Sequence, residues 1–149
     1  MEWLFGEKLP DKTWIEQFEV RSDYHYPEQF IQIVLEHDGA SPKNNVYDTE
    51  LIKGRVFEYL LSFNEEDDAP IWDYLGDEKE WDIDGLDWRY VPFAIDPFGN
   101  FICFDRTNDR VVFWNHETTE VEVVADDFSS FIDALYPFDE EEFFAKYMN

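Results

Sequence analysis

Cysteine is almost absent from this chain, because Cys103 is the only one among 149 residues. A single cysteine excludes an intrachain disulfide and any metal cluster built from several thiolates. Cys103 lies in the apolar run Phe101-Ile102-Cys103-Phe104. We therefore expect it to pack as a small buried side chain.

Glycine is also scarce, with six residues in the chain. The sequence has no phosphate-binding loop, no dinucleotide fingerprint and no Gly-x-Ser-x-Gly elbow. Its three histidines, His25, His37 and His116, do not have the spacing of a helical metal site. We therefore expect a protein that is not an enzyme and that holds no cofactor.

One acidic stretch imitates the first half of a calcium-binding loop, with the pattern Glu80-x-Asp82-x-Asp84-Gly85. Such a loop needs a bidentate glutamate at its twelfth position, which here is Val91. Its eighth position, where an apolar residue is expected, is also acidic. The stretch therefore predicts no metal site.

Long hydrophobic runs are missing as well. The first residues, MEWLFGEK, lack the apolar stretch behind a basic start that marks a secretion signal. No stretch approaches the ~20 apolar residues of a membrane span. These absences predict a cytoplasmic protein with no membrane partner.

Positive charge is the largest deficit, since 11 Lys and Arg stand against 36 Asp and Glu, for a net charge of −25. A nucleic-acid binder needs cations to displace counterions from phosphate, and an anionic membrane also attracts basic segments. Both partners are therefore disfavoured. A basic protein partner is favoured by long-range attraction.

What the chain has in abundance is aromatic side chains, with 15 Phe, 8 Tyr and 6 Trp. Acidic chains are often disordered, but rings in this number can bury enough apolar surface to offset the entropy lost on folding. The length fits one domain, which we place at residues 1–149.

Apolar residues at helical spacing predict helices near both ends of the chain. The first begins at a capping box, Thr13-x-x-Glu16, and the second has Pro27 in its first turn and Gly39 after its end. A third is capped by Asp126 or Asp127. Their apolar faces are Trp14, Ile15 and Phe18; Phe30, Ile31, Val34 and Leu35; and Phe128, Phe131, Ile132 and Leu135.

Short β runs separated by turns fill the second half of the chain and predict an antiparallel meander. The turn Asp96-Pro97-Phe98-Gly99-Asn100 has Pro and Gly where a type I turn favours them. We assign its Gly99, Asp96 and Asn100 to folding. The expected strands are 55–63, 90–95, 101–105, 111–114 and 121–124, with short helical turns at 71–75 and within 139–149.

Between Asp67 and Trp88, tryptophans alternate with acids. Trp is a favoured anchor of protein interfaces, and acidic rims attract basic partners. The opposite interpretation, in which the rings face inward and attach the loop to the core, is open on the sequence alone. The acids we expect to be exposed.

Four pieces of the chain together resemble the SUKH superfamily, in the branch of the yeast cell-wall synthesis regulator, the Smi/Knr type. The similarity covers roughly residues 14–135, and Asp38 stands where the family usually has Asn. The pieces are Tyr26-Pro27-Glu28-Gln29-Phe30 through Gly39; Gly54-Arg55 through Asn64; Val91 through Asp105; and Val111 through Glu117 with Val124 through Phe128 and Phe131.

The resemblance implies an α+β domain with a central, mainly antiparallel sheet, N-terminal helices and a C-terminal helix. It also implies an immunity protein that binds and neutralises a cognate secreted polymorphic toxin, in many cases a nuclease. A nuclease cleft is basic, so an acidic surface suits it. We predict a toxin-binding surface of Glu65, Glu66, Asp67, Asp68, Asp77, Glu78, Asp82, Asp84 and Asp87, with Trp72 and Trp81 as anchors.

The sequence is compatible with two other classes of function. One is an intracellular scaffold or regulator, as the eukaryotic relatives suggest. The other is a hydrolase with two catalytic carboxylates, which requires a pocket that holds two acids with perturbed pKa values. The oligomeric state is not predicted.

Overall fold

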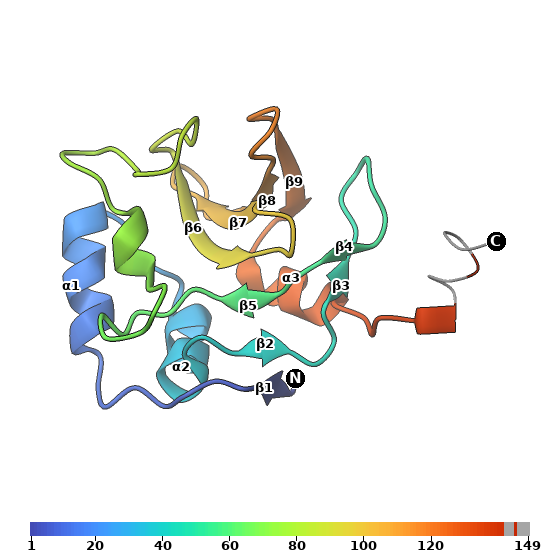
Figure 1. Cartoon of the computed structure of the whole chain (residues 1–149), viewed down its shortest axis with the longest axis horizontal. Helices are drawn as coiled ribbons and strands as arrows, with labels where there is room; N and C mark the ends of the chain where they lie inside the picture. Colours follow the sequence, from blue (N-terminus) through green and yellow to red (C-terminus); the bar gives the residue numbers. More distant parts are fainter. Residues whose placement is uncertain (142–144, 146–149) are drawn as a thin grey trace.

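The helices of the computed structural model lie at the two ends of the chain, as the sequence predicts; the structure describes residues 1–141 and 145. α1 spans Thr13–Ser22, α2 spans Glu28–His37 and α3 spans Phe128–Ala134. A single 3₁₀ turn, η1, covers Ile71–Tyr74. Figure 1 shows α1 at one edge of the molecule and α3 behind the strands.

A five-stranded antiparallel sheet forms the centre, in the order β5-β6-β7-β8-β9. Two small strand pairs, β1 with β2 and β3 with β4, lie beside it. The expected α+β class and the meander are therefore confirmed. The strands are β1 Trp3–Leu4, β2 Ser41–Pro42, β3 Val46–Tyr47, β4 Arg55–Val56, β5 Tyr59–Leu60, β6 Tyr90–Ile95, β7 Phe101–Asp105, β8 Val111–Trp114 and β9 Val121–Ala125.

The expected strand over 55–63 is wrong, because the chain changes hydrogen-bond partners in the middle of it. β4 pairs with β3, whereas β5 pairs with β6. At the change, the Phe57 N–H donates to Asn45 and the Glu58 N–H donates to Ile95. β propensity cannot signal such a change, since it reports side-chain fit to a pleated surface and not the identity of the neighbouring strand.

The residues that cap the helices agree only in part with those expected from the sequence. The capping box is wrong: Lys12 is the N-cap residue of α1, and Asp11 instead accepts a hydrogen bond from the Thr13 N–H at 2.8 Å. Asp127 does cap α3, through a bond from the Ser130 N–H at 2.8 Å. Gly39 follows α2 with φ of +73°, a conformation that glycine adopts without strain.

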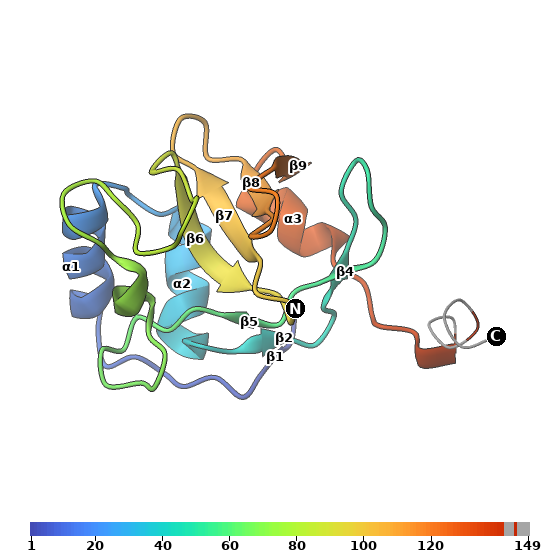
Figure 2. The ribbon, with the colours of Figure 1, turned by 45° about the horizontal axis from the view of Figure 1, so that its top comes forward.

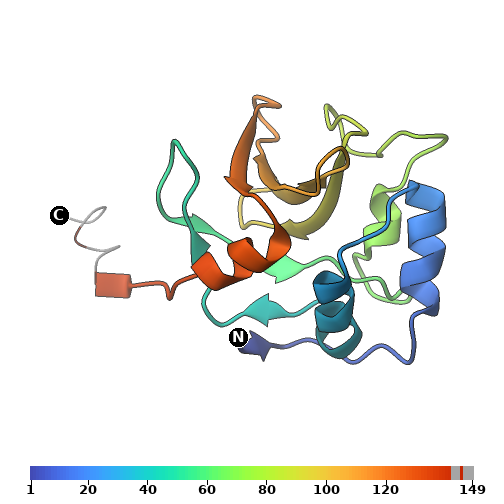
Figure 3. The same cartoon turned by 180° about the vertical axis from the view of Figure 1, so that it is seen from behind.

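Phe30 of α2 lies at the centre of an aromatic core on one face of the sheet. Its ring is fully buried, and ring centroids of Tyr26, Phe104, Phe93 and Phe128 lie 4.9, 5.3, 5.5 and 5.5 Å away. These rings come from α2, the residues just before it, the sheet and α3; Figure 3 shows these elements from behind. The abundant aromatic side chains thus form the packing contacts between the helices and the sheet.

The other face of the sheet is covered by residues 64–89, which we name the acidic segment. Phe101 and Phe104 are three residues apart on β7 and so point to opposite faces. Phe101 contacts Tyr74 of the acidic segment with ring centroids 5.2 Å apart. Cover on both faces explains why every residue of β7 and β8 is buried, including Cys103 as expected.

The helical turn expected within 139–149 falls largely on 142–144 and 146–149, outside the described residues. Within the described part of the chain, no helix combines the length and apolar character that crossing a membrane requires.

Candidate interaction surface

A buried carboxylate at the end of α2 binds the residues that directly precede the acidic segment. Asp38 is 4% exposed and accepts hydrogen bonds from the Ser62 hydroxyl at 2.5 Å and from the Phe63 N–H at 2.8 Å. Burial raises the pKa of Asp38 above its ordinary value, although these hydrogen bonds act in the opposite direction. Asp38 therefore fixes where the segment leaves the core.

The variant Asp38→Asn is expected to gain stability over the natural protein as the pH rises above about 4, the ordinary pKa of an aspartate. Because the raised pKa means that folded Asp38 holds its proton more tightly, the natural protein loses stability as the pH rises through that pKa. Asn has no such proton. Its Oδ1 can accept from Phe63 and its amide can donate to Ser62.

Urea unfolding of both proteins between about pH 4.5 and about pH 7.5, followed by tryptophan fluorescence, measures this difference. The difference in unfolding free energy should grow with pH. A difference that stays constant over this range would show that the environment of Asp38 does not favour its neutral form.

Trp72, one of the two predicted anchors, is held by the core and is half-buried. Its indole N–H donates to the Phe63 carbonyl at 2.8 Å, and its ring meets Phe18 of α1 edge-on at 5.2 Å. The Arg21 guanidinium lies 6.0 Å from the same ring. Only part of this ring faces solvent, so it offers a partner a rim and not a free side chain.

Trp81, the other predicted anchor, is wrong in that role. It is 3% exposed, stacked on Phe18 at 6.3 Å and packed on Trp88 at 4.5 Å. A ring so enclosed cannot contact a partner. The inward-facing interpretation therefore holds for Trp81, because its apolar ring is more stable against Phe18 of α1 and Trp88 than in water.

Two arginines hold the end of the acidic segment. Arg106 donates to the Trp88 carbonyl at 3.0 Å and to the Ser22 carbonyl at 2.8 Å, and it lies over the Trp88 ring at 4.5 Å. Arg89 makes two hydrogen bonds to Asp105, at 3.0 and 2.8 Å. Burial alone would raise the pKa of Asp105. The hydrogen bonds that Asp105 accepts from Arg89 and Thr107 have a larger, opposite effect, so its pKa is lowered.

The predicted acids all face solvent. Their backbone follows the two loops of the segment, 64–69 and 76–88, which lie at opposite ends of η1 (Figure 2). The acids therefore form two groups along one side of the molecule and not one cluster. Among them, Asp87 also accepts from the Arg89 N–H at 2.8 Å, so it has a structural role. The exposed acids are Glu65, Glu66, Asp67, Asp68, Asp77, Glu78, Asp82, Asp84 and Asp87.

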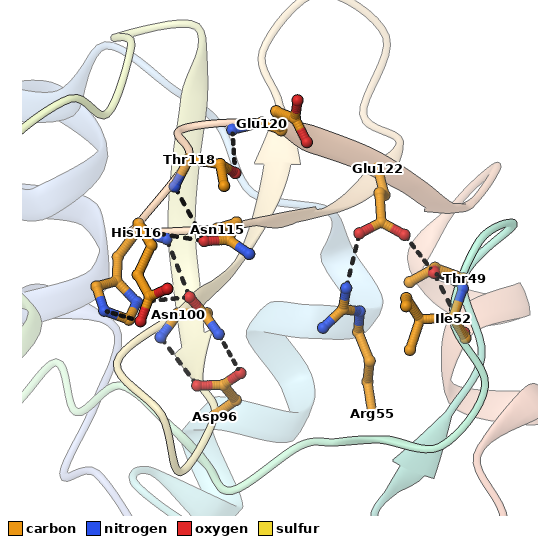
Figure 4. Close-up of polar contacts among 11 residues, drawn as sticks. Thr49, Ile52, Arg55, Asp96, Asn100, Asn115, His116, Thr118, Glu120 and Glu122 are labelled. Atoms are coloured by element: carbon orange, nitrogen blue, oxygen red, sulfur yellow. Dashed lines mark hydrogen bonds and ion pairs between the residues drawn. The ribbon is translucent and has the colours of Figure 1, made fainter.

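The turns at one end of the sheet form a polar network that the sequence assigns to folding. Asp96 accepts from the Phe98 and Asn100 N–H groups at 2.8 and 2.9 Å, as expected of a turn residue. Asn100 in turn accepts from the His116 N–H at 2.9 Å, which joins this turn to the next (Figure 4). Phe98, at the tip, is 72% exposed and was not singled out by the sequence.

A second polar contact attaches the β3–β4 hairpin to the edge of the sheet. The Arg55 guanidinium lies 3.7 Å from the Phe113 ring and donates to Glu122 at 2.8 Å (Figure 4). Thr49 donates to the other oxygen of Glu122. Glu122 is thereby neutralised within the fold and contributes little to an acidic surface.

A groove of about 660 Å³ opens between α1 and α2. Of its acids, Glu16 and Glu19 come from one flank of α1 and Asp23 follows its last residue, while Phe18 on another flank faces the acidic segment. The groove was not predicted from the sequence. Its signal was the acidic spacing of three and four residues along α1, but nothing in the sequence shows which element lies opposite.

Within residues 1–141 and 145, no three His, Cys, Asp or Glu side chains converge as ligands for a metal ion. Glu80, the first residue of the calcium-loop imitation, closes a tight turn with Gly76: the Gly76 N–H donates to the Glu80 carbonyl at 2.9 Å, and a Cβ on Gly76 would lie 2.7 Å from that oxygen. The exposed acids of the acidic segment and the acidic groove both carry negative charge, which suits binding to a positively charged partner.

The chain is similar to a known protein family. A model of the SMI1 / KNR4 family (SUKH-1) matches residues 9–134. No curated protein matches the chain. The matched range includes α1, α2, the acidic segment and the whole five-stranded sheet.

Proposed function

Because this chain belongs to the SMI1/KNR4 (SUKH-1) family, we propose that it is an immunity protein that neutralises a cognate secreted toxin by binding it. Proteins of this family are typically immunity proteins that bind cognate toxins. The toxin is a basic nuclease, and the two proteins meet in the cytoplasm of the cell that makes the immunity protein. The work is stoichiometric binding and not catalysis.

The proposal rests on the different burial of the aromatic and the acidic side chains in the acidic segment. Its Trp81 ring is buried and its Trp72 ring is half-buried, whereas its acids face solvent on two loops fixed by Asp38 at one end and Arg106 at the other. A nuclease attracts phosphate with a basic cleft. Fixed acids opposite such a cleft speed the encounter, which matters because a free nuclease acts catalytically.

The test is co-expression with the toxin domain encoded beside the gene of this protein. We expect growth to be restored, and a tagged copy of this chain to retain the toxin domain in a pull-down. An unrelated toxin domain of similar basic charge is the control, since charge alone would retain both. Retention of neither domain, together with failure to restore growth, would contradict the proposal.

A further inference from the structure

The groove between α1 and α2 has an apolar floor. Ile15 of α1, Ile31 of α2 and Tyr24 of the connection between them all contribute to it and are buried. Figure 3 shows the two helices and this connection from behind. A floor of this kind can cover the aliphatic part of a long side chain.

The walls of the groove are acidic. Glu16, Glu19 and Asp23 line one side, and Glu28, at the start of α2, lines the other. Lys12 and His25 are the basic residues of the lining. The excess of negative charge favours a cationic occupant and disfavours a second copy of this chain, whose net charge is also −25.

One of these carboxylates is already oriented. The Glu19 side chain is 13% exposed, and its Oε2 accepts from the Tyr26 N–H at 2.7 Å and lies 2.7 Å from His25 Nδ1. A carboxylate held in this way loses little conformational freedom when it pairs with a cation. Because Oε2 already has these two partners, an added Arg or Lys pairs with Glu19 through its other oxygen, Oε1, in a charge-assisted hydrogen bond.

An exposed apolar side chain completes the groove. Val20 belongs to the lining and is 81% exposed, in the last turn of α1, between the charged residues Glu19 and Arg21. A single exposed valine is common on protein surfaces. Here it lies beside an oriented carboxylate and above an apolar floor, so an apolar residue of a partner can cover it.

We propose that this groove binds a basic segment of the toxin, in which Arg or Lys residues alternate with apolar side chains. The cationic head pairs with Glu19, its aliphatic stem lies on Tyr24 and Ile31, and an apolar neighbour covers Val20. The groove and the acidic segment lie on different flanks of α1. The identity of the partner rests on the proposed function; the chemistry of the occupant does not.

The matched variants are Val20→Arg and Leu51→Arg. Both positions are exposed, at 81% and 80%, and both changes add one positive charge and the same side chain. Val20→Arg places that charge in the groove, whereas Leu51→Arg places it on the loop between β3 and β4, which Figure 1 shows far from α1. Thermal melts should show that both variants fold.

The first measurement uses a capped hexapeptide of alternating Arg and Leu, titrated into the ¹⁵N-labelled full chain at physiological ionic strength. We expect the largest amide shift changes within residues 12–31. Val20→Arg should weaken binding about tenfold, since like charges at a contact repel, and Leu51→Arg should weaken it less than about twofold. Shift changes centred elsewhere, absence of saturable binding, or equal effects of the two variants would overturn the proposal.

The second measurement uses the toxin domain encoded beside the gene and separates the two proposals. If the natural protein binds that domain and Val20→Arg weakens binding no more than Leu51→Arg, the groove is not the docking site and the immunity function stands. If the natural protein does not bind it, the immunity function fails, and the hexapeptide titration alone decides the groove.

Discussion

Replacing Glu65, Glu66 and Asp68 with lysine is expected to slow association with a basic toxin domain by roughly tenfold or more. The three side chains are exposed and lie in one loop of the acidic segment. Long-range attraction raises the rate at which oppositely charged proteins meet, and salt screens it. The association rate of the variant should therefore also depend less on ionic strength. Stopped-flow mixing at several salt concentrations measures both effects.

The matched control replaces Glu50, Glu120 and Asp133 with lysine. These residues are also exposed, and the control changes the net charge by the same amount. If net charge alone directs the encounter, the two sets will slow association equally. An equal effect, or protection against the toxin that survives the first set unchanged, would show that this loop does not face the toxin.

Replacing Trp81 with alanine is expected to lower the free energy of unfolding by about 3–5 kcal/mol, the usual cost of removing a large buried ring. The ring is 3% exposed and packs between Phe18 and Trp88, so its loss leaves a cavity between α1 and the acidic segment. Urea unfolding followed by circular dichroism gives the change. An exposed anchor would instead leave stability nearly unchanged.

The companion variant Trp81→Phe separates packing from hydrogen bonding. The buried Trp81 indole N–H has no hydrogen-bond partner among the described residues. Phenylalanine keeps most of the ring and removes this unpaired donor, so the loss of stability should be much smaller than with alanine. Equal losses in the two variants would mean that the ring does not stabilise the segment through its packing.

The elements that could be predicted from the sequence are those with local causes. The strands from Phe101 and Val111 lie between turn residues, and the Asp127 cap and Gly39 act within a few residues of their own position. The strand expected over 55–63 depended on which distant strand lay beside it, and the sequence contains no local signal for that.

For the candidate surface, too, some features could be predicted from the sequence and others could not. Exposure of the acids followed from their charge, because an unpaired charge is costly to bury. Whether Trp81 faced outward or inward depended on Phe18, 63 residues earlier, and on Trp88. The groove depended on α2 lying across from the acidic flank of α1.

The sequence by itself determined the scarcity of positive charge, the aromatic core, the meander and the resemblance to one family, since each is a property of composition or of neighbouring residues. Only the tertiary structure decided that the acids form two groups at opposite ends of η1, that Trp81 belongs to the core, and that an acidic groove with an apolar floor lies beside α1. The physical reason is that burial and concavity arise between elements far apart in the chain, where side-chain packing and not local pattern sets the geometry.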